Sequence, residues 1–345
     1  MDIPSVSHGE GDLADRVEAE LRALGRLDVR RIGDNVVART ALGRGRRLLL
    51  AGHLDTVPAN GNAHSRLEGD TLWGLGSADM KGGLAVMLDL AAGIASPAVD
   101  VTWVFYAAEE VAREHNGLLQ IEATDRGLLR ADAAILGEPT GAVIEAGCQG
   151  VLKAEVVLGG VRAHTARPWM GVNALHRLGP LLDLLDSGWT REPLIDGCRY
   201  REAVQAVKAE AGVATNVVPD RATLVINHRF APDRDEAAAE SQLREWLGPF
   251  LDPAQGDSLT VVDSSPAAPP NLTHPLLEAL VRTTGATPRA KLGWTDVAFF
   301  TERGVPAVNF GPGDPELAHT ADERVTGSDL ERARSCLESV LTSGS

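Results

Sequence analysis

The sequence predicts an α/β protein with a mixed or parallel sheet flanked by helices, interrupted by a smaller α+β part. Short apolar runs of strand length alternate with helical patterns in the first half of the chain and again after Pro275. From Val151 the pattern changes, and the runs up to residue 264 alternate apolar with polar residues. The length of 345 residues exceeds one ordinary compact domain and suits two.

Each expected element follows from its periodicity. In the α/β part, apolar residues at helical or buried-strand spacing predict helices at 13–24, 80–92 and 328–341, and strands at 47–51, 101–106, 133–136 and 306–310. A further helix is expected after Pro275. In the α+β part the same reasoning predicts strands at 153–158, 203–209 and 222–230, helices at 173–185 and 236–247, and a turn-rich stretch at 252–270.

Composition narrows the possible partners. The formal net charge is −15 and no basic patch is visible, which argues against a nucleic acid or an anionic membrane as partner. The three cysteines are far apart and odd in number, so a disulfide framework is not expected. No run approaches membrane-spanning length, and the first residues do not resemble a secretory signal, so we expect a cytoplasmic protein.

Candidate metal ligands follow the expected strands at the point where each strand ends. In open α/β sheets, loops at the carboxyl ends of the strands gather at one rim and form the binding site. The side chains expected there, together with one at the start of the 80–92 helix, are His53, Asp79, Glu109, Glu110, Glu138 and His319.

This mixture of imidazoles and carboxylates suits zinc, with cobalt or manganese as alternatives. Asp55, two residues after His53, offers the acceptor that a metal-bound histidine needs to fix its tautomer. Glu109 and Glu110 are adjacent carboxylates that would repel each other unless a cation lay nearby. One of them is expected to bind metal while the other faces the attacking water as a general base.

Each of these residues also has a purely structural interpretation. Asp79 would serve equally as a helix N-cap, and His53 as a structural histidine at a strand end. The Glu109–Glu110 pair is also typical of a solvated loop, Glu138 of a plain loop start, and His319 of a surface position. The metal interpretation is favoured because all of these alternatives would have to hold together.

The motifs, in this order, resemble the family of co-catalytic zinc deacylases and exopeptidases. The matching segments span most of the chain and are residues 52–58, 76–83, 108–110, 137–140, 163–167 and 318–319. The resemblance implies a zinc-exopeptidase-like catalytic domain at 1–149 and 265–345, with a dimerisation domain at 150–264. It also implies a cis peptide at Asp79–Met80.

The resemblance assigns roles to the motif residues. Asp79 bridges two zinc ions, for which cobalt is a possible substitute. His53 and Glu138 complete one site, and Glu110 and His319 the other. Asp55 orients His53, and Glu109 is the general base.

The resemblance also implies a homodimer and a small-molecule substrate. His164 and Asn216 resemble residues that reach the neighbouring protomer's active site, and Arg229 resembles a clamp for a substrate carboxylate. Without the resemblance, Arg229 would be interpreted as a surface residue of a strand.

Further segments at 148–150, 198–202, 291–297 and 311–315 resemble the actinobacterial desuccinylases of this family. They imply hydrolysis of N-succinyl-LL-2,6-diaminopimelate to LL-2,6-diaminopimelate and succinate, in lysine and diaminopimelate biosynthesis. One alternative is the same chemistry on another N-acyl amino acid, such as N-acetylornithine. An alternative of another class is a catalytically inactive binding or dimerisation module, which the complete set of ligands and Glu109 argue against.

Overall fold

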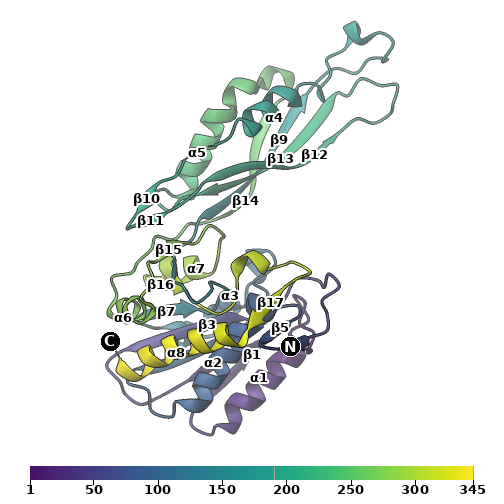
Figure 1. Cartoon of the computed structure of the whole chain (residues 1–345). Coiled ribbons are helices and arrows are strands. Elements are labelled where there is room, and N and C mark those ends of the chain that lie inside the picture. The colour runs from purple at the N-terminus through teal and green to yellow at the C-terminus, as the bar shows by residue number, and fades with distance from the viewer. Residues whose placement is uncertain (190, 345) are drawn as a thin grey trace. The chain divides into compact units, whose positions relative to one another are not determined.

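The chain folds into two compact units in the computed structural model, which describes residues 1–189 and 191–344 (Figure 1). Unit 1 contains Met1–Gly147, Pro270–Ala290 and Thr295–Ser345, and unit 2 contains Cys148–Pro269 and Lys291–Trp294. Residues 291–294 thus lie in unit 2, outside the insertion expected at 150–264. The catalytic and dimerisation roles expected for the two parts remain predictions.

Unit 1 is built on an eight-stranded mixed sheet with the strand order β1-β2-β6-β3-β7-β16-β8-β15. A second, three-stranded sheet has the order β17-β5-β4. The strands of unit 1 are β1 Asp28–Ile32, β2 Asn35–Arg39, β3 Arg47–His53, β4 Arg66–Glu68, β5 Thr71–Trp73, β6 Asp100–Tyr106, β7 Ala133–Leu136, β8 Glu145–Ala146, β15 Arg289–Ala290, β16 Ala307–Asn309 and β17 Arg324–Thr326.

Helices flank the large sheet. Helix α2 contacts both α1 and α8, and the three lie side by side (Figure 1). The helices of unit 1 are α1 Gly11–Ala23, α2 Gly82–Gly93, α3 Gly117–Asp125, α6 Pro275–Thr284, α7 Val297–Glu302 and α8 Gly327–Ser343. Strands β3 and β6 are buried along almost their whole length, as expected for apolar strands covered on both faces. The mixed α/β fold class is therefore confirmed.

Helix α2 begins at Gly82, two residues later than the pattern predicts, and its N-cap is Lys81. Asp79 (φ −116°, ψ 95°) and Met80 (φ −134°, ψ 36°) have non-helical backbone angles. The peptide between them is cis, as the resemblance implied. Asp79 is therefore not a helix cap, and the structural alternative for this residue is wrong.

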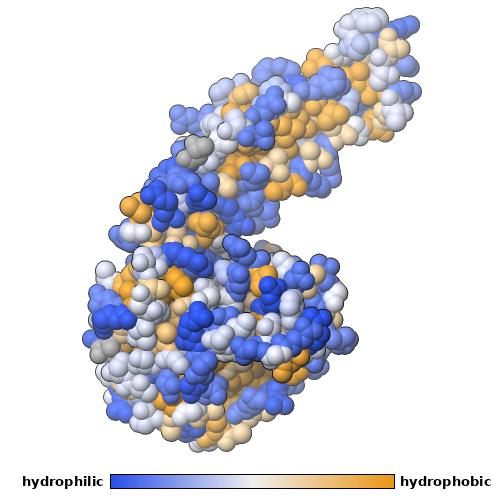
Figure 2. Space-filling model, in the orientation of Figure 1, coloured by the Kyte–Doolittle hydropathy of each residue, from blue (hydrophilic) through white to orange (hydrophobic). Residues whose placement is uncertain are grey.

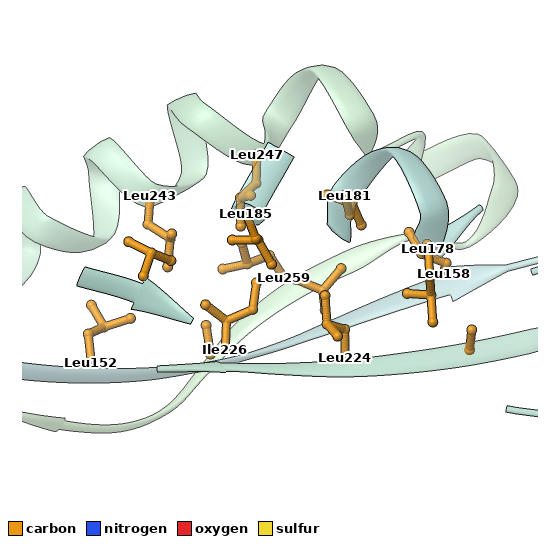
Figure 3. Packing of buried hydrophobic residues seen from close by; sticks show 14 of the residues in the cluster. Leu152, Leu158, Leu178, Leu181, Leu185, Leu224, Ile226, Leu243, Leu247 and Leu259 are labelled. Atoms are coloured by element: carbon orange, nitrogen blue, oxygen red, sulfur yellow. The ribbon is translucent and has the colours of Figure 1, made fainter. Parts of the chain in front are cut away.

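Unit 2 is an antiparallel sheet of order β12-β13-β9-β14, packed against two helices. Its elements are β9 Gly150–Gly159, α4 Leu178–Asp186, β10 Leu194–Ile195, β11 Cys198–Arg199, β12 Ala203–Ala211, β13 Arg221–Phe230, α5 Glu236–Leu247 and β14 Ser258–Ser265. Alternate residues of β9 and β13 are buried. Figure 3 shows leucines of α4 and α5 facing those of the sheet across this core.

Two elements of unit 2 differ from expectation. Helix α4 begins at Leu178 instead of residue 173, because the Asn173 side chain accepts the N–H groups of Leu175 and His176 and forms a turn. The turn-rich stretch contains β14, which pairs with β9 in antiparallel register. Leu259 of β14 packs into the leucine core, so tertiary pairing outweighs the local turn signals.

The remaining expectations concern cysteines and membranes. Cys148, Cys198 and Cys336 are buried free thiols. Among the described residues, no helix combines the length and the apolar character that crossing a membrane requires.

Candidate metal centre

The loops that carry the expected ligands meet because their strands are parallel neighbours. β3 lies between β6 and β7 and is parallel to both, and β16 is parallel to β7 on its other side. Their carboxyl ends therefore lie at one edge of the sheet. His53 is the last residue of β3, and Glu110, Glu138 and His319 lie in the loops that follow β6, β7 and β16. Asp79 reaches the same edge from the segment Ser77–Lys81, which precedes α2.

The first cluster consists of His53, Asp79 and Glu138. One ligand atom from each lies within 4.8 Å of the other two. His53 Nε2 is 3.0 Å from Asp79 Oδ1. His53 is almost fully buried and Glu138 is buried, so this cluster lies below the protein surface.

The second cluster consists of Asp79, Glu110 and His319, again with ligand atoms within 4.8 Å of one another. His319 Nε2 lies 2.8 Å from Glu110 Oε1 and 3.5 Å from Asp79 Oδ2. Asp79 belongs to both clusters and turns one carboxylate oxygen toward each histidine. A carboxylate placed in this way could hold two cations at once.

The electrostatics of the two clusters agree with cation binding. Burial acts to lower the pKa of His53, but its contacts with Asp55 and Asp79 raise it well above the usual value. Hydrogen bonds to Asp79 and Glu110 raise the pKa of His319 to about 10. Burial acts to raise the pKa of Asp79, yet the two histidines hold it below the usual range. The carboxylates of the site thus stabilise positive charge beside them, and bound divalent cations would supply such charge.

Asp55 organises the loop that carries the two glutamates. Its Oδ1 accepts the Glu109 N–H at 3.0 Å, and its Oδ2 accepts the Glu110 N–H at 3.0 Å and the Ser7 hydroxyl at 2.8 Å. His53 Nδ1 lies 3.0 Å from the Asp55 carbonyl oxygen and 3.5 Å from its carboxylate. The nearest acceptor for this imidazole is therefore the main chain of Asp55, with the carboxylate farther away.

Glu109 lies beside both clusters and belongs to neither of the two that share Asp79. It forms a third group of possible ligand atoms with His53 and Glu110. Burial raises the pKa of Glu109 well above its usual value; His53 opposes the rise, while the negative charges of Glu138 and Asp296 add to it. A carboxylate with a raised pKa is a stronger base than an ordinary glutamate.

The residues present fit a pair of divalent transition-metal ions. Each cluster supplies one imidazole nitrogen and two carboxylate groups, one of them shared. This mixed N/O set, with one position open to water or substrate, is typical of catalytic zinc sites. Two histidines and three carboxylates are therefore available to hold such a pair of ions.

The three remaining expected residues lie in unit 2. His164 and Asn216 are exposed on adjoining segments, joined by a hydrogen bond from Thr165 N to Asn216 O of 3.1 Å. His164 Nδ1 accepts the Ala166 N–H at 3.0 Å, so the neutral ring carries its proton on Nε2 and can donate it outward. Arg229, on β13, is partly buried and forms no salt bridge within the described part of the chain.

Sequence reasoning assigned no role to three residues that shape the site. Glu323 accepts hydrogen bonds from the loop that carries Asp79, Glu10 Oε1 accepts the Ala108 N–H at 3.0 Å, and Ser7 donates to Asp55. A glutamate that accepts backbone N–H groups has no local sequence signature. Glu323, between Asp322 and Arg324, is indistinguishable in sequence from a solvated charge.

The chain belongs to the peptidase family M20/M25/M40, whose model matches residues 49–343. Among its relatives, the Corynebacterium glutamicum succinyl-diaminopimelate desuccinylase is 43% identical, over 99% of this chain and 94% of that protein. A Mycobacterium tuberculosis protein provisionally named succinyl-diaminopimelate desuccinylase DapE is 49% identical, over 99% of this chain and 95% of its own length.

The fold also occurs among solved structures. Bacillus subtilis YXEP, described as a dinuclear metal-binding peptidase of the M20 family, matches with a TM-score of 0.68 and 17% identity. The match covers 98% of this chain and 93% of that one. At this level of identity the likeness concerns the fold.

Proposed function

We propose that this chain is a metal-dependent amide hydrolase that converts N-succinyl-LL-2,6-diaminopimelate and water to LL-2,6-diaminopimelate and succinate. The observation that carries the chemistry is Asp79, shared between two clusters that each contain one histidine and one further glutamate. The relatives at 43% and 49% identity support the choice of substrate, since both are named for this activity.

Two zinc ions are the proposed cofactor, with cobalt as a substitute. His53 and Glu138 would hold one ion, Glu110 and His319 the other, and Asp79 both. The bound ions would supply Lewis acidity at the amide carbonyl and a water molecule of lowered pKa.

Glu109 is the proposed general base. Its carboxylate removes a proton from the attacking water and then delivers that proton to the nitrogen of the leaving amine. Attack of the water forms the C–O bond at the tetrahedral carbon, and the C–N bond breaks afterwards as Glu109 protonates the nitrogen, so one proton passes through Glu109 in each turnover. The hydrogen bond from Glu109 N to Asp55 supports this role, because it fixes the backbone from which the carboxylate projects.

Unit 2 is proposed to contribute substrate contacts and a dimer interface. An outward Nε2–H of His164 is a suitable donor to a developing oxyanion, and Arg229 is available to a substrate carboxylate. Several large apolar side chains of this unit are exposed, among them Trp169 (78%), Met170 (66%) and Val213 (65%). Figure 2 shows hydrophobic surface on this unit. In the described part of the chain β12 is an edge strand of its sheet, and together with this surface it favours association with a second copy.

The test is a hydrolysis assay of the purified protein with N-succinyl-LL-2,6-diaminopimelate, before and after chelation. Activity should disappear on removal of metal and return on addition of zinc or cobalt. Activity that survives complete removal of metal would contradict the proposal.

N-acetylornithine serves as the competing substrate in the same assay. We expect a higher kcat/KM for the succinylated compound. Faster cleavage of N-acetylornithine would keep the chemistry and overturn the substrate. Absence of turnover with either compound and with other N-acyl amino acids, in metal-loaded protein, would favour an inactive binding module.

A further inference from the structure

The Glu323 carboxylate binds three backbone N–H groups of the loop that presents Asp79. Its Oε2 accepts the Gly76 N–H at 2.9 Å, and its Oε1 accepts those of Ala78 at 3.0 Å and Asp79 at 2.9 Å. The Glu323 residue is only 2% exposed, although charged residues surround it in the sequence. Its main-chain oxygen also accepts the Gly74 N–H at 3.0 Å.

The loop also has local backbone hydrogen bonds, from Ser77 N–H to the Gly74 carbonyl at 3.0 Å and from Lys81 N–H to the Gly76 carbonyl at 2.7 Å. Gly76 has a left-handed backbone (φ 74°), and α2 begins only at Gly82. The N–H groups bound by Glu323 have no partner within a regular helix or strand, and buried N–H groups without a partner are costly. The Glu323 carboxylate therefore supplies a charge-assisted acceptor to three N–H groups of the segment that carries the shared ligand.

Glu323 also belongs to the segment that carries His319, four residues earlier in the chain. The two are connected through the Thr320 carbonyl, which accepts the Glu323 N–H at 3.4 Å. One buried side chain thus ties the Asp79 loop to the His319 loop. These two residues face each other in the second cluster, where His319 Nε2 lies 3.5 Å from Asp79 Oδ2.

We propose that Glu323 is a positioning residue of the metal centre, which sets the place of Asp79 relative to His319. This inference rests on the proposed metal-binding role of Asp79. It predicts that loss of the carboxylate weakens metal binding even when the fold persists. Outer partners of metal ligands typically contribute about 10- to 100-fold in metal affinity or activity.

The test variant is Glu323→Gln, which keeps size and shape. Both Glu323 oxygens accept backbone N–H groups. In the glutamine variant an NH₂ group replaces one of these oxygens, so a donor faces a donor there and that hydrogen bond is lost. Glu323→Asp keeps the charge but is one methylene shorter. The aspartate variant should retain part of the zinc affinity that the native glutamate confers. It serves as a second variant if the glutamine protein folds poorly.

Asp100→Asn is the matched control. Asp100 is also buried (5% exposed) and accepts two backbone N–H groups, from Leu42 at 2.9 Å and Arg44 at 2.8 Å. It lies at the first residue of β6, at the opposite end of the strand from the metal ligands. Asp100→Asn should lower the melting temperature but leave metal affinity unchanged.

The measurement is calorimetric titration of zinc into metal-free protein, together with the visible spectrum of the cobalt form. We expect Glu323→Gln to bind zinc about 10- to 100-fold more weakly than wild type and to change the cobalt spectrum. The aspartate variant should fall between the two. If wild type binds no metal, the proposed function itself fails.

Two results would overturn the positioning role alone while wild type binds two ions. One is wild-type zinc affinity in folded Glu323→Gln protein. The other is failure of both Glu323 variants to fold, which would make the residue a general determinant of the fold.

Discussion

Asp55 illustrates how a single side chain organises the chemistry of its neighbours. Its carboxylate accepts two consecutive backbone N–H groups and a hydroxyl, and it lies near His53. Burial acts to raise the pKa of Asp55, but His53 and the N–H groups of Glu109 and Glu110 lower it to about 2. It therefore remains an acceptor throughout the physiological pH range.

Replacing Asp55 by asparagine should separate positioning from metal coordination. The asparagine side chain has one acceptor oxygen and one NH₂ group. Either the Glu109 N–H or the Glu110 N–H therefore faces that NH₂ group and loses its hydrogen bond, and the backbone there shifts. We expect kcat/KM to fall about 10- to 100-fold with the fold intact. Asp125→Asn is a suitable control, because Asp125 accepts the Gly127 N–H in an exposed helical turn. Wild-type kinetics of the Asp55 variant would show that the loop needs no such anchor.

Glu109→Ala tests the proposed base. The five proposed ligands are other residues, so the variant should take up zinc nearly as wild type does. Turnover should fall by about 100- to 10,000-fold, the usual contribution of a positioned acid–base group. Zinc content and kcat are measured on the same preparation. Wild-type turnover in this variant would exclude Glu109 as the base.

Among the elements of unit 2, β9, α4 and the segment before β14 are joined by one acidic residue. Asp257 Oδ1 accepts the Gly159 N–H at 2.9 Å and a hydrogen bond from Arg177 Nη1 at 2.7 Å, and its Oδ2 accepts the Asp252 N–H at 2.7 Å. The Asp257 side chain has no exposed surface, and that of Arg177 is 20% exposed. Burial acts to raise the pKa of Asp257, but Arg177 and these N–H groups lower it.

Asp257→Asn should reduce the free energy of unfolding of this unit by about 1–3 kcal/mol at neutral pH. Because the pKa of Asp257 is lowered on folding, its contribution is present above the unfolded carboxylate pKa of about 4 and is lost as the pH falls through the folded value. The difference between wild type and variant should therefore shrink toward acid pH. Urea unfolding at several pH values measures it.

Asp263→Asn is the control for this experiment. Asp263 forms an exposed ion pair with Lys153 at 3.4 Å, and its side chain is 57% exposed. Such pairs contribute little, so the control should change stability by less than about 1 kcal/mol. A pH-independent loss in Asp257→Asn would assign its effect to packing instead of charge.

At the scale of the whole molecule, the proposed dimer predicts that two inactive variants regain activity when their subunits are mixed. If His164 acts in the partner's active site, His164→Ala and Glu109→Ala proteins are each inactive. A mixed dimer contains one site with an intact Glu109 and the partner's intact His164. Subunit exchange of equal amounts should thus restore about a quarter of wild-type activity, since half the dimers are mixed and each has one working site.

Mixing each variant with itself provides the control for subunit exchange. The dimer itself is checked by light scattering before and after mixing. Absence of recovered activity in demonstrably mixed dimers would place the role of His164 within its own protomer or remove it from catalysis.

Local patterns in the sequence were sufficient for much of this molecule. Apolar periodicity predicted most helices and the four middle strands of the large sheet, β6, β3, β7 and β16, because burial on one or both faces requires apolar residues at regular spacing. It did not predict the outer strands β1, β2, β8 and β15. The rule that loops gather at the carboxyl ends of parallel strands brought His53, Glu110 and Glu138 to one rim, where the structure also has them.

Other features were decided only by tertiary structure, since they depend on partners distant in the chain. Strand β14 forms because β9 is available to pair with it, although its own residues favour turns. Glu323 and Asp79 are 244 residues apart, and their hydrogen bond exists only once the fold brings the two loops together. The sequence by itself determined which residues could bind metal. The fold decided which carboxylates hold the backbone in place. Every residue except proline has the same backbone N–H group, so the sequence does not show which side chain accepts it.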